Sequence, residues 1–252
     1  MGLDIYAGTL ARYHTGSWET IMQRTAREQG MNVRMVYAGE SPARLSEPLA
    51  PLTVSRWREH LESKYHLLNG LSWSEDTSTP YWTDKPDHDG QRALVLAAAH
   101  TEHSEFELPT ALPESMEVNP AYFAASRDYV NSIIAILECH LFLPSEEDFI
   151  FSEDDAVGVR RVTTSTANLA WALDAVNTFC WQASEAQFTE WRKRGPASVG
   201  PVVEFEDGMI VREDEVQPST EPFQHAAQFG FAVYNEALTF SRKHNVPILT
   251  DE

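Results

Sequence analysis

The sequence predicts an α+β fold with a mixed sheet opened by a β-α-β unit, and three observations support this prediction. Strand-forming segments gather early in the chain, whereas segments with helical periodicity dominate its later part. Apolar residues make up 42% of the chain and aromatic residues 11%, so a large core can form. Because 252 residues is near the limit of one hydrophobic core, we expect a single domain over residues 1–252, with a soft subdivision near 110–118 as the alternative.

The predicted β-α-β unit occupies the first residues of the chain. Residues 2–10 are rich in β-compatible side chains and form the first predicted strand. Ser17 can cap the following helix, whose apolar positions recur at helical spacing until Gly30 supplies a stop. Residues 32–37 are the second predicted strand, and a parallel pairing of the two strands would require a right-handed crossover.

The next elements alternate between loops and apolar segments. A proline-rich loop over 38–52 precedes a helix over 54–69, which has an apolar stripe at helical spacing. A polar loop with several aromatic residues is expected at 71–91, and loops of that length are usually functional or mobile. Residues 92–99 are predicted as a buried strand, although their alanines also suit a short helix.

The later part of the chain carries strong helix-start patterns. These are the Asn119-Pro120 pair, a cap at Thr164 or Ser165, and the capping box of Ser184 and Gln187. The first of these helices is expected to continue to Leu141. Short strands are predicted at 149–151 and in a hairpin that pairs 202–205 with 209–212 through an Asp-Gly turn. The last helix, over 221–243, is apolar on more than one face and should be central and packed with the other amphipathic helices.

The chain has the features of a cytoplasmic protein. An acid at position 4 and the lack of a basic, then apolar, leader argue against secretion. The longest apolar runs, at 93–99 and 133–137, are far shorter than the about 18 residues of a membrane span. Cys139 and Cys180 lie in predicted helices, and we expect both to be buried, reduced thiols.

Charge narrows the choice of partners. Nineteen basic and 38 acidic residues give a net charge of −19, which disfavours nucleic acid and anionic membranes because both bind through Lys and Arg. The charge is uneven, since residues 1–70 carry eight basic and seven acidic side chains and residues 71–252 carry the remaining excess of acids. The charge therefore favours a basic protein as the partner.

Two short stretches hold twelve of the acids. The first stretch contains Glu146, Glu147, Asp148, Glu153, Asp154 and Asp155; the second contains Glu204, Glu206, Asp207, Glu213, Asp214 and Glu215. Like charges at this density repel one another in the folded state, and a basic partner would convert the repulsion into steered association. The alternatives are solvated strand edges, guarded by charge against edge pairing, and cation binding. The second stretch is the predicted partner-binding site.

The leading interpretation is a non-enzymatic, acidic protein-binding module without a cofactor. In being small, acidic and cytosolic it is similar to bacterial immunity proteins, which fill the basic clefts of nucleic-acid-processing toxins. This similarity is one of composition and implies no fold and no residue role. The sequence leaves the oligomeric state open.

The alternative interpretation is a metal-assisted hydrolase. His100 and His103, together with Glu105, form the densest group of metal-ligand types, and on a helix the two imidazoles would share one face. Hydrogen-bonded histidines at a strand end explain the same pattern. Trp73, together with Tyr81 and Trp82, would line a pocket in this interpretation or else pin the long loop to the core. The sequence has no nucleophile elbow, P-loop or dinucleotide fingerprint.

Overall fold

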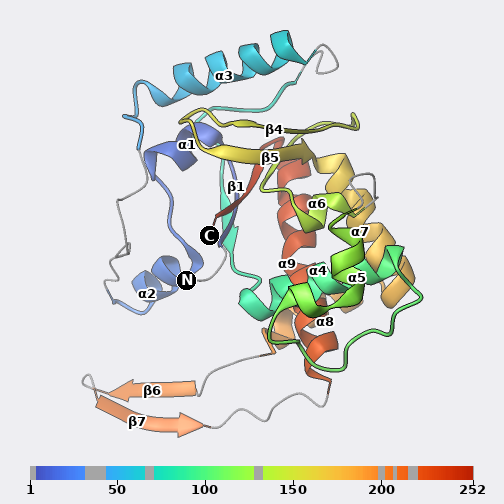
Figure 1. Cartoon of the computed structure of the whole chain (residues 1–252). Helices are drawn as coiled ribbons and strands as arrows, with labels where there is room; N and C mark the ends of the chain where they lie inside the picture. The colour runs from blue at the N-terminus through green and yellow to red at the C-terminus, as the bar shows by residue number, and fades with distance from the viewer. Residues whose placement is uncertain are drawn as a thin grey trace. The chain divides into compact units, whose positions relative to one another are not determined.

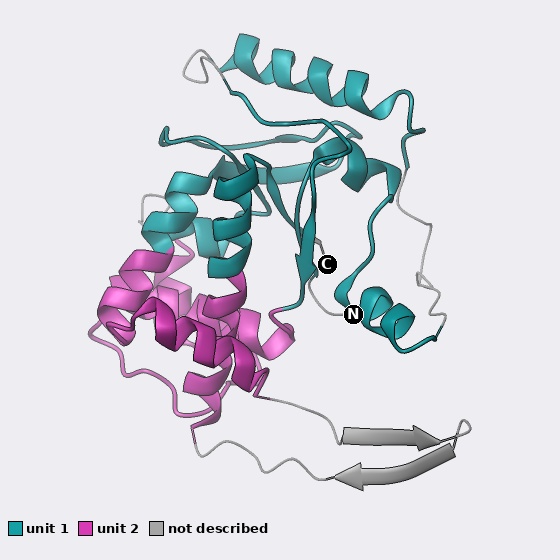
Figure 2. Ribbon diagram, turned by 180° about the vertical axis from the view of Figure 1, so that it is seen from behind, with its two compact units in different colours: residues 1–85, 132–172, 235–252 teal, residues 86–131, 173–234 magenta. Residues whose placement is uncertain are grey.

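The computed structural model describes residues 4–31, 44–65, 71–127, 133–197, 202–206, 209–214 and 221–251. The chain forms two compact units (Figure 2): unit 1 comprises Met1–Lys85, Ser132–Ala172 and Asn235–Glu252, and unit 2 comprises Pro86–Asn131 and Leu173–Tyr234. The single domain stays a prediction. A mixed sheet with helices packed on it confirms the predicted α+β class (Figure 1).

A six-stranded mixed sheet organises unit 1. Its order is β2-β1-β8-β3-β5-β4. The strands are β1 (Asp4–Ala7), β2 (Trp82–Asp84), β3 (Leu141–Leu143), β4 (Ile150–Asp154), β5 (Arg160–Ser165) and β8 (Ile248–Asp251). Within this described sheet β3 and β5 are the one parallel pair, and the other neighbours are antiparallel. The carboxyl ends of β3 and β5 therefore lie at the same edge of the sheet.

The opening of the chain differs from the prediction in its helices. After β1 come α1 (Leu10–Thr15) and α2 (Ile21–Glu28). Thr20 caps α2 in place of Ser17, because Thr20 and Gln23 form a reciprocal capping box. Both neighbours of β1 are antiparallel, and the predicted second strand at 32–37 lies outside the described residues.

The helix predicted over 54–69 is α3 (Ala50–Lys64), with Pro51 in its first turn. Its apolar stripe, Val54, Trp57 and Leu61, is buried as predicted. These side chains pack into a core cluster with Tyr6 and other aromatic and aliphatic residues of unit 1. The cluster fixes α3 over one part of the sheet.

Two predictions are wrong in the middle of the chain. Residues 92–99 belong to α4 (His88–Glu102), not to a strand, because Asp87 caps the helix by accepting the Gly90 N–H at 2.6 Å and the alanine-rich run continues it. The helix predicted to reach Leu141 is short pieces, and Leu141 itself begins β3. Residues 93–99 of α4 and 141–143 of β3 are all buried, so hydrophobic periodicity cannot separate helix from strand there.

Unit 2 is mainly helical. It contains α4, η1 (Met116–Val118), α5 (Pro120–Ala125), α8 (Glu185–Arg194) and the two-stranded sheet of β6 (Val202–Glu206) and β7 (Met209–Asp214). It also takes parts of α7 (Thr166–Cys180) and α9 (Pro222–His244), whereas α6 (Ile134–Leu137) belongs to unit 1. Phe231 of α9 contacts the rings of Trp181, Phe188 and Trp191.

The last helix is central, as predicted. Residues 222–234 of α9 pack among the helices of unit 2, and residues 235–244 pack in unit 1 beside the sheet (Figure 1). Ala226, Phe231 and Leu238 are buried along its length. No helix within the described residues is long and apolar enough to cross a membrane.

Candidate functional site

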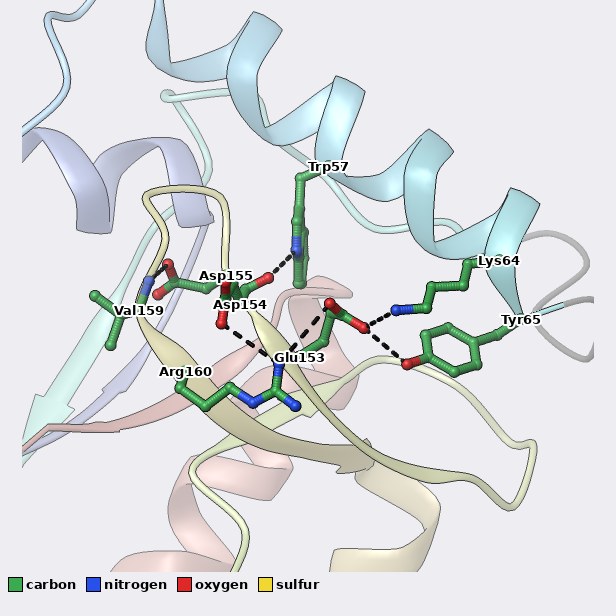
Figure 3. Close-up of polar contacts among 8 residues, drawn as sticks. All are labelled: Trp57, Lys64, Tyr65, Glu153, Asp154, Asp155, Val159 and Arg160. Carbon is green, nitrogen blue, oxygen red and sulfur yellow. Dashed lines mark hydrogen bonds and ion pairs between the residues drawn. The ribbon is translucent and has the colours of Figure 1, made fainter.

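The first acidic stretch separates into paired and unpaired carboxylates, and Figure 3 shows the paired part at the β4–β5 hairpin. Glu153 accepts hydrogen bonds from the Lys64 ammonium and, at 2.9 Å, from the Tyr65 hydroxyl. The Lys64 hydrogen bond is the main cause that lowers the pKa of Glu153. Arg160 lies 3.5 Å from Asp154 and 3.9 Å from Glu153. These two acids are therefore largely neutralised by the chain's own cations.

Asp155 is the most constrained carboxylate of the stretch. One of its oxygens accepts the backbone N–H groups of Val157 and Val159 at 3.0 Å, and the other lies 2.8 Å from Arg161 Nε. Trp57 adds a hydrogen bond from its indole N–H to the Asp154 carbonyl at 2.8 Å. This arrangement fixes the hairpin turn and leaves little negative charge for an external partner.

The acids before β4 are different. Glu146, Glu147 and Asp148 are exposed, and none of them makes an ion pair with the residues that the structure describes. Their contacts are local: Ser145 Oγ accepts the Glu147 N–H at 3.0 Å, and Asp148 accepts from the Asn168 side-chain amide at 2.9 Å. Negative charge at 146–148 therefore faces solvent.

The predicted partner-binding residues lie on and around β6 and β7. Glu204 and Glu206 are in β6, Glu213 and Asp214 are in β7, and Asp207 and Glu215 lie outside the described residues. The strands pair antiparallel, as predicted, with Val203 opposite Glu213, Val202 opposite Asp214, and an irregularity between Glu204 and Phe205. The structure describes the backbone of this hairpin, so the role of its acids stays a prediction.

His100 and His103 lie at the carboxyl end of α4. His100 is 1% exposed, and the backbone of Phe106 lies near its imidazole. His103 follows the helix as its cap, and its Nδ1 lies 3.4 Å from Glu105 Oε1. Across the described ranges, no group of three or more His, Cys, Asp or Glu side chains is arranged to hold a metal ion.

Burial of His100 predicts a dependence of stability on pH. Burial lowers the pKa of His100, so the unfolded state binds more protons as the pH falls through the ordinary value of about 6.5. Stability present above that value should be lost below it. We expect the free energy of unfolding to fall more steeply from about pH 7.5 to about pH 5 in the native protein than in His100→Gln. His88→Gln, at the exposed start of the same helix, is the control; equal slopes in native protein and H100Q would contradict the prediction.

The aromatic residues of the long loop are bound into the core. Trp73 is buried, its indole N–H donates to Glu75, and Arg58 lies 4.0 Å from its ring centre. The Tyr81 hydroxyl accepts the Glu19 N–H at 3.1 Å, and Trp82 begins β2. These contacts agree with the interpretation that the aromatic residues pin the loop.

Glu75, in the same loop, is a buried acid. Its two oxygens accept the N–H groups of Leu10 and Ala11, at 3.2 and 2.7 Å, at the first turn of α1. Burial raises the pKa of Glu75. The two backbone bonds give this carboxylate a structural role, because they satisfy N–H groups that have no partner within the helix.

Neither cysteine is suited to nucleophilic chemistry. Both Cys139 and Cys180 are free thiols; Cys139 is buried, as predicted, whereas Cys180 is only partly buried, so the prediction that both are buried is wrong for Cys180. Burial raises the pKa of each to about 12. The reactive thiolate is therefore scarce at neutral pH.

Unit 1 also contains an open pocket of about 600 Å³, which was not predicted from the sequence. The described residues that line it are Pro144, Ser145, Glu146, Thr166, Arg242 and Asn245. Ligand pockets often form at the carboxyl ends of parallel strands. The parallel pair could not indicate this pocket, because β5 was not predicted from the sequence.

The fold and these contacts define an α+β protein with an acidic surface segment. Comparison with protein-family models, with curated proteins and with solved structures gives no match.

Proposed function

We propose that the chain is an acidic, cytoplasmic protein-binding module that presents negative surface to a basic protein partner, as an immunity-type inhibitor does. The observation that carries the proposal is uncompensated charge. The net charge is −19, and Glu146, Glu147 and Asp148 are exposed without an ion pair among the described residues, in contrast to the paired Glu153. An acidic surface without internal cations keeps its field for an external ligand.

The acidic surface is expected to act mainly on the rate at which a basic partner associates. Lys and Arg side chains of a partner are attracted over about a Debye length, about 8 Å at physiological salt, so the acids act mainly on the rate of association. The same charge repels nucleic acid and anionic lipid. Two free thiols with raised pKa values are compatible with a reducing compartment.

The β6–β7 hairpin is the proposed centre of the interface. It brings acids from two stretches of chain onto paired strands, Glu204 and Glu206 on one and Glu213 and Asp214 on the other. Neighbouring strands lie about 4.8 Å apart, so the pairing brings the two acidic segments together in one hairpin.

The experiment is affinity capture with a six-amide variant. Glu204, Glu206, Asp207, Glu213, Asp214 and Glu215 are replaced by Gln or Asn, and immobilised native and variant proteins are used to capture partners from the source cell at low and high salt. We expect the native protein to retain a stoichiometric basic protein that the variant loses. With the purified partner, the association rate should fall at least about tenfold and its salt dependence should flatten.

A second six-amide variant distinguishes the loss of a specific binding site from the loss of overall negative charge. It carries the same change at exposed acids elsewhere: Glu28, Glu59, Glu107, Asp174, Glu185 and Glu236. Partner association should remain close to native in this variant. Equal losses in both variants, or unchanged kinetics in the first, would refute the proposed site.

A further inference from the structure

The open pocket of unit 1 lies at the carboxyl ends of β3 and β5. The two strands are parallel, with Leu143 opposite Ser165. The chain leaves β3 through Pro144, Ser145 and Glu146, and it leaves β5 directly into α7, whose first residue is Thr166. In sheets with parallel strands this edge is where ligands bind, because strand exits and helix N-termini converge there.

Thr166, the first residue of α7, is a polar residue at this pocket. Thr166 is 3% exposed, yet it lines the pocket. Its hydroxyl makes no hydrogen bond with the part of the chain that the structure describes, whereas neighbouring groups are satisfied: Ala167 N–H donates to Ser145 O and Asn168 N–H to Ser165 Oγ. The hydroxyl is open to the pocket, so a ligand oxygen would replace solvent as its hydrogen-bond partner.

Arg242 brings positive charge to the same pocket. It lies in the last turn of α9, is exposed, and makes no ion pair with the described residues, although the chain has twice as many acids as bases. The turn that follows it is held in place, because Asn245 donates to the Ser72 carbonyl at 2.7 Å and the Val246 N–H donates to the Ser241 carbonyl at 3.2 Å. The backbone that carries Arg242 is thus held beside the pocket, and its exposed guanidinium is available to an anion.

We propose that this pocket binds a small oxyanion, a phosphoryl or carboxylate group. Arg242 supplies the charge-assisted hydrogen bonds, and the Thr166 hydroxyl supplies a further hydrogen bond. Glu146 also lines the pocket and is exposed, so it disfavours polyanions and favours a singly charged group or a ligand that also carries a cation. The inference is independent of the proposed protein partner.

The test is titration of the full chain with inorganic phosphate and, separately, with acetate, followed by NMR chemical shifts and isothermal calorimetry. We expect saturable binding with shifts confined to the pocket. Arg242→Gln should weaken binding about tenfold, and Thr166→Val should weaken it by a smaller factor. Glu146→Gln should strengthen binding, and this gain cannot result from misfolding.

Lys243→Gln is the matched control, because it removes the same charge from the next residue, which is exposed and is not among the residues lining the pocket. Binding should be unchanged in K243Q. Binding of phosphate without acetate assigns a phosphoryl ligand, and binding of both assigns the carboxylate group as well. Non-saturable binding, or equal weakening by R242Q and K243Q, would overturn the proposal, since either means diffuse attraction of ions to the surface.

Discussion

Replacing Asp155 by alanine is expected to lower the free energy of unfolding by about 3–5 kcal/mol, the range for breaking a buried ion pair. The Asp155 and Arg161 side chains are 3% and 11% exposed, and their atoms lie 2.8 Å apart. The second carboxylate oxygen accepts the Val157 and Val159 N–H groups. The substitution therefore takes a carboxylate from a buried guanidinium and opens two backbone hydrogen bonds at once.

Asp154→Ala provides the matched control, because it removes an acid from the adjacent position of the same hairpin. The Asp154 side chain is 60% exposed and lies 3.5 Å from Arg160, so the expected loss is below about 1 kcal/mol. Urea unfolding followed by circular dichroism measures both variants. A loss in D155A no larger than in D154A would mean that burial adds nothing to the Asp155 interactions.

The same hairpin shows why the charge of a site is difficult to predict from sequence. Arg160 and Arg161 follow Asp154 and Asp155 closely in the sequence, but nothing local indicates the main partner of Glu153. The cation that binds Glu153 is Lys64, 89 residues away along the chain. Only the tertiary fold brings such distant pairs together. The sequence therefore shows where the acids are, but not the electrostatic potential that they produce at the surface.

Elements with local signals were predictable. Asn119 caps α5 by accepting the Tyr122 N–H, and the Ser184–Gln187 box starts α8, both as predicted. The capping interactions depend on residues within one helical turn, so a short window of sequence contains them. The strands of the β6–β7 hairpin follow from local patterning in the same way.

Elements without a polar face were not predictable. The 92–99 segment and Leu141 are enclosed by other parts of the protein, and an entirely apolar run has the same appearance in a buried helix and in a buried strand. The pocket shares this limitation, because Thr166 and Arg242 come from distant segments and meet only once β5 and α9 are in place.

Replacing Gly230 by alanine is expected to lower the free energy of unfolding by about 3 kcal/mol, although the same change on an open helix surface usually stabilises by about 1 kcal/mol. A Cβ atom at Gly230 of α9 would lie 2.3 Å from the Gly90 carbonyl oxygen and 2.8 Å from its carbon, both in α4. Backbone atoms cannot turn away as a side chain can, so the two helices would have to separate. Helix propensity alone predicts that the substitution stabilises the protein, whereas the clash predicts that it destabilises it. The sign of the measured change therefore distinguishes the two effects.

Gly90→Ala tests the same contact from the other side. A Cβ there would find its nearest neighbours at 3.4 Å, which is van der Waals contact, so the free energy of unfolding should change by less than about 1 kcal/mol. Thermal and urea unfolding of both variants give the comparison. If G230A proves as stable as G90A, α4 and α9 can move apart without measurable loss of packing. The close approach of the two helices at Gly230 would then not be needed for stability.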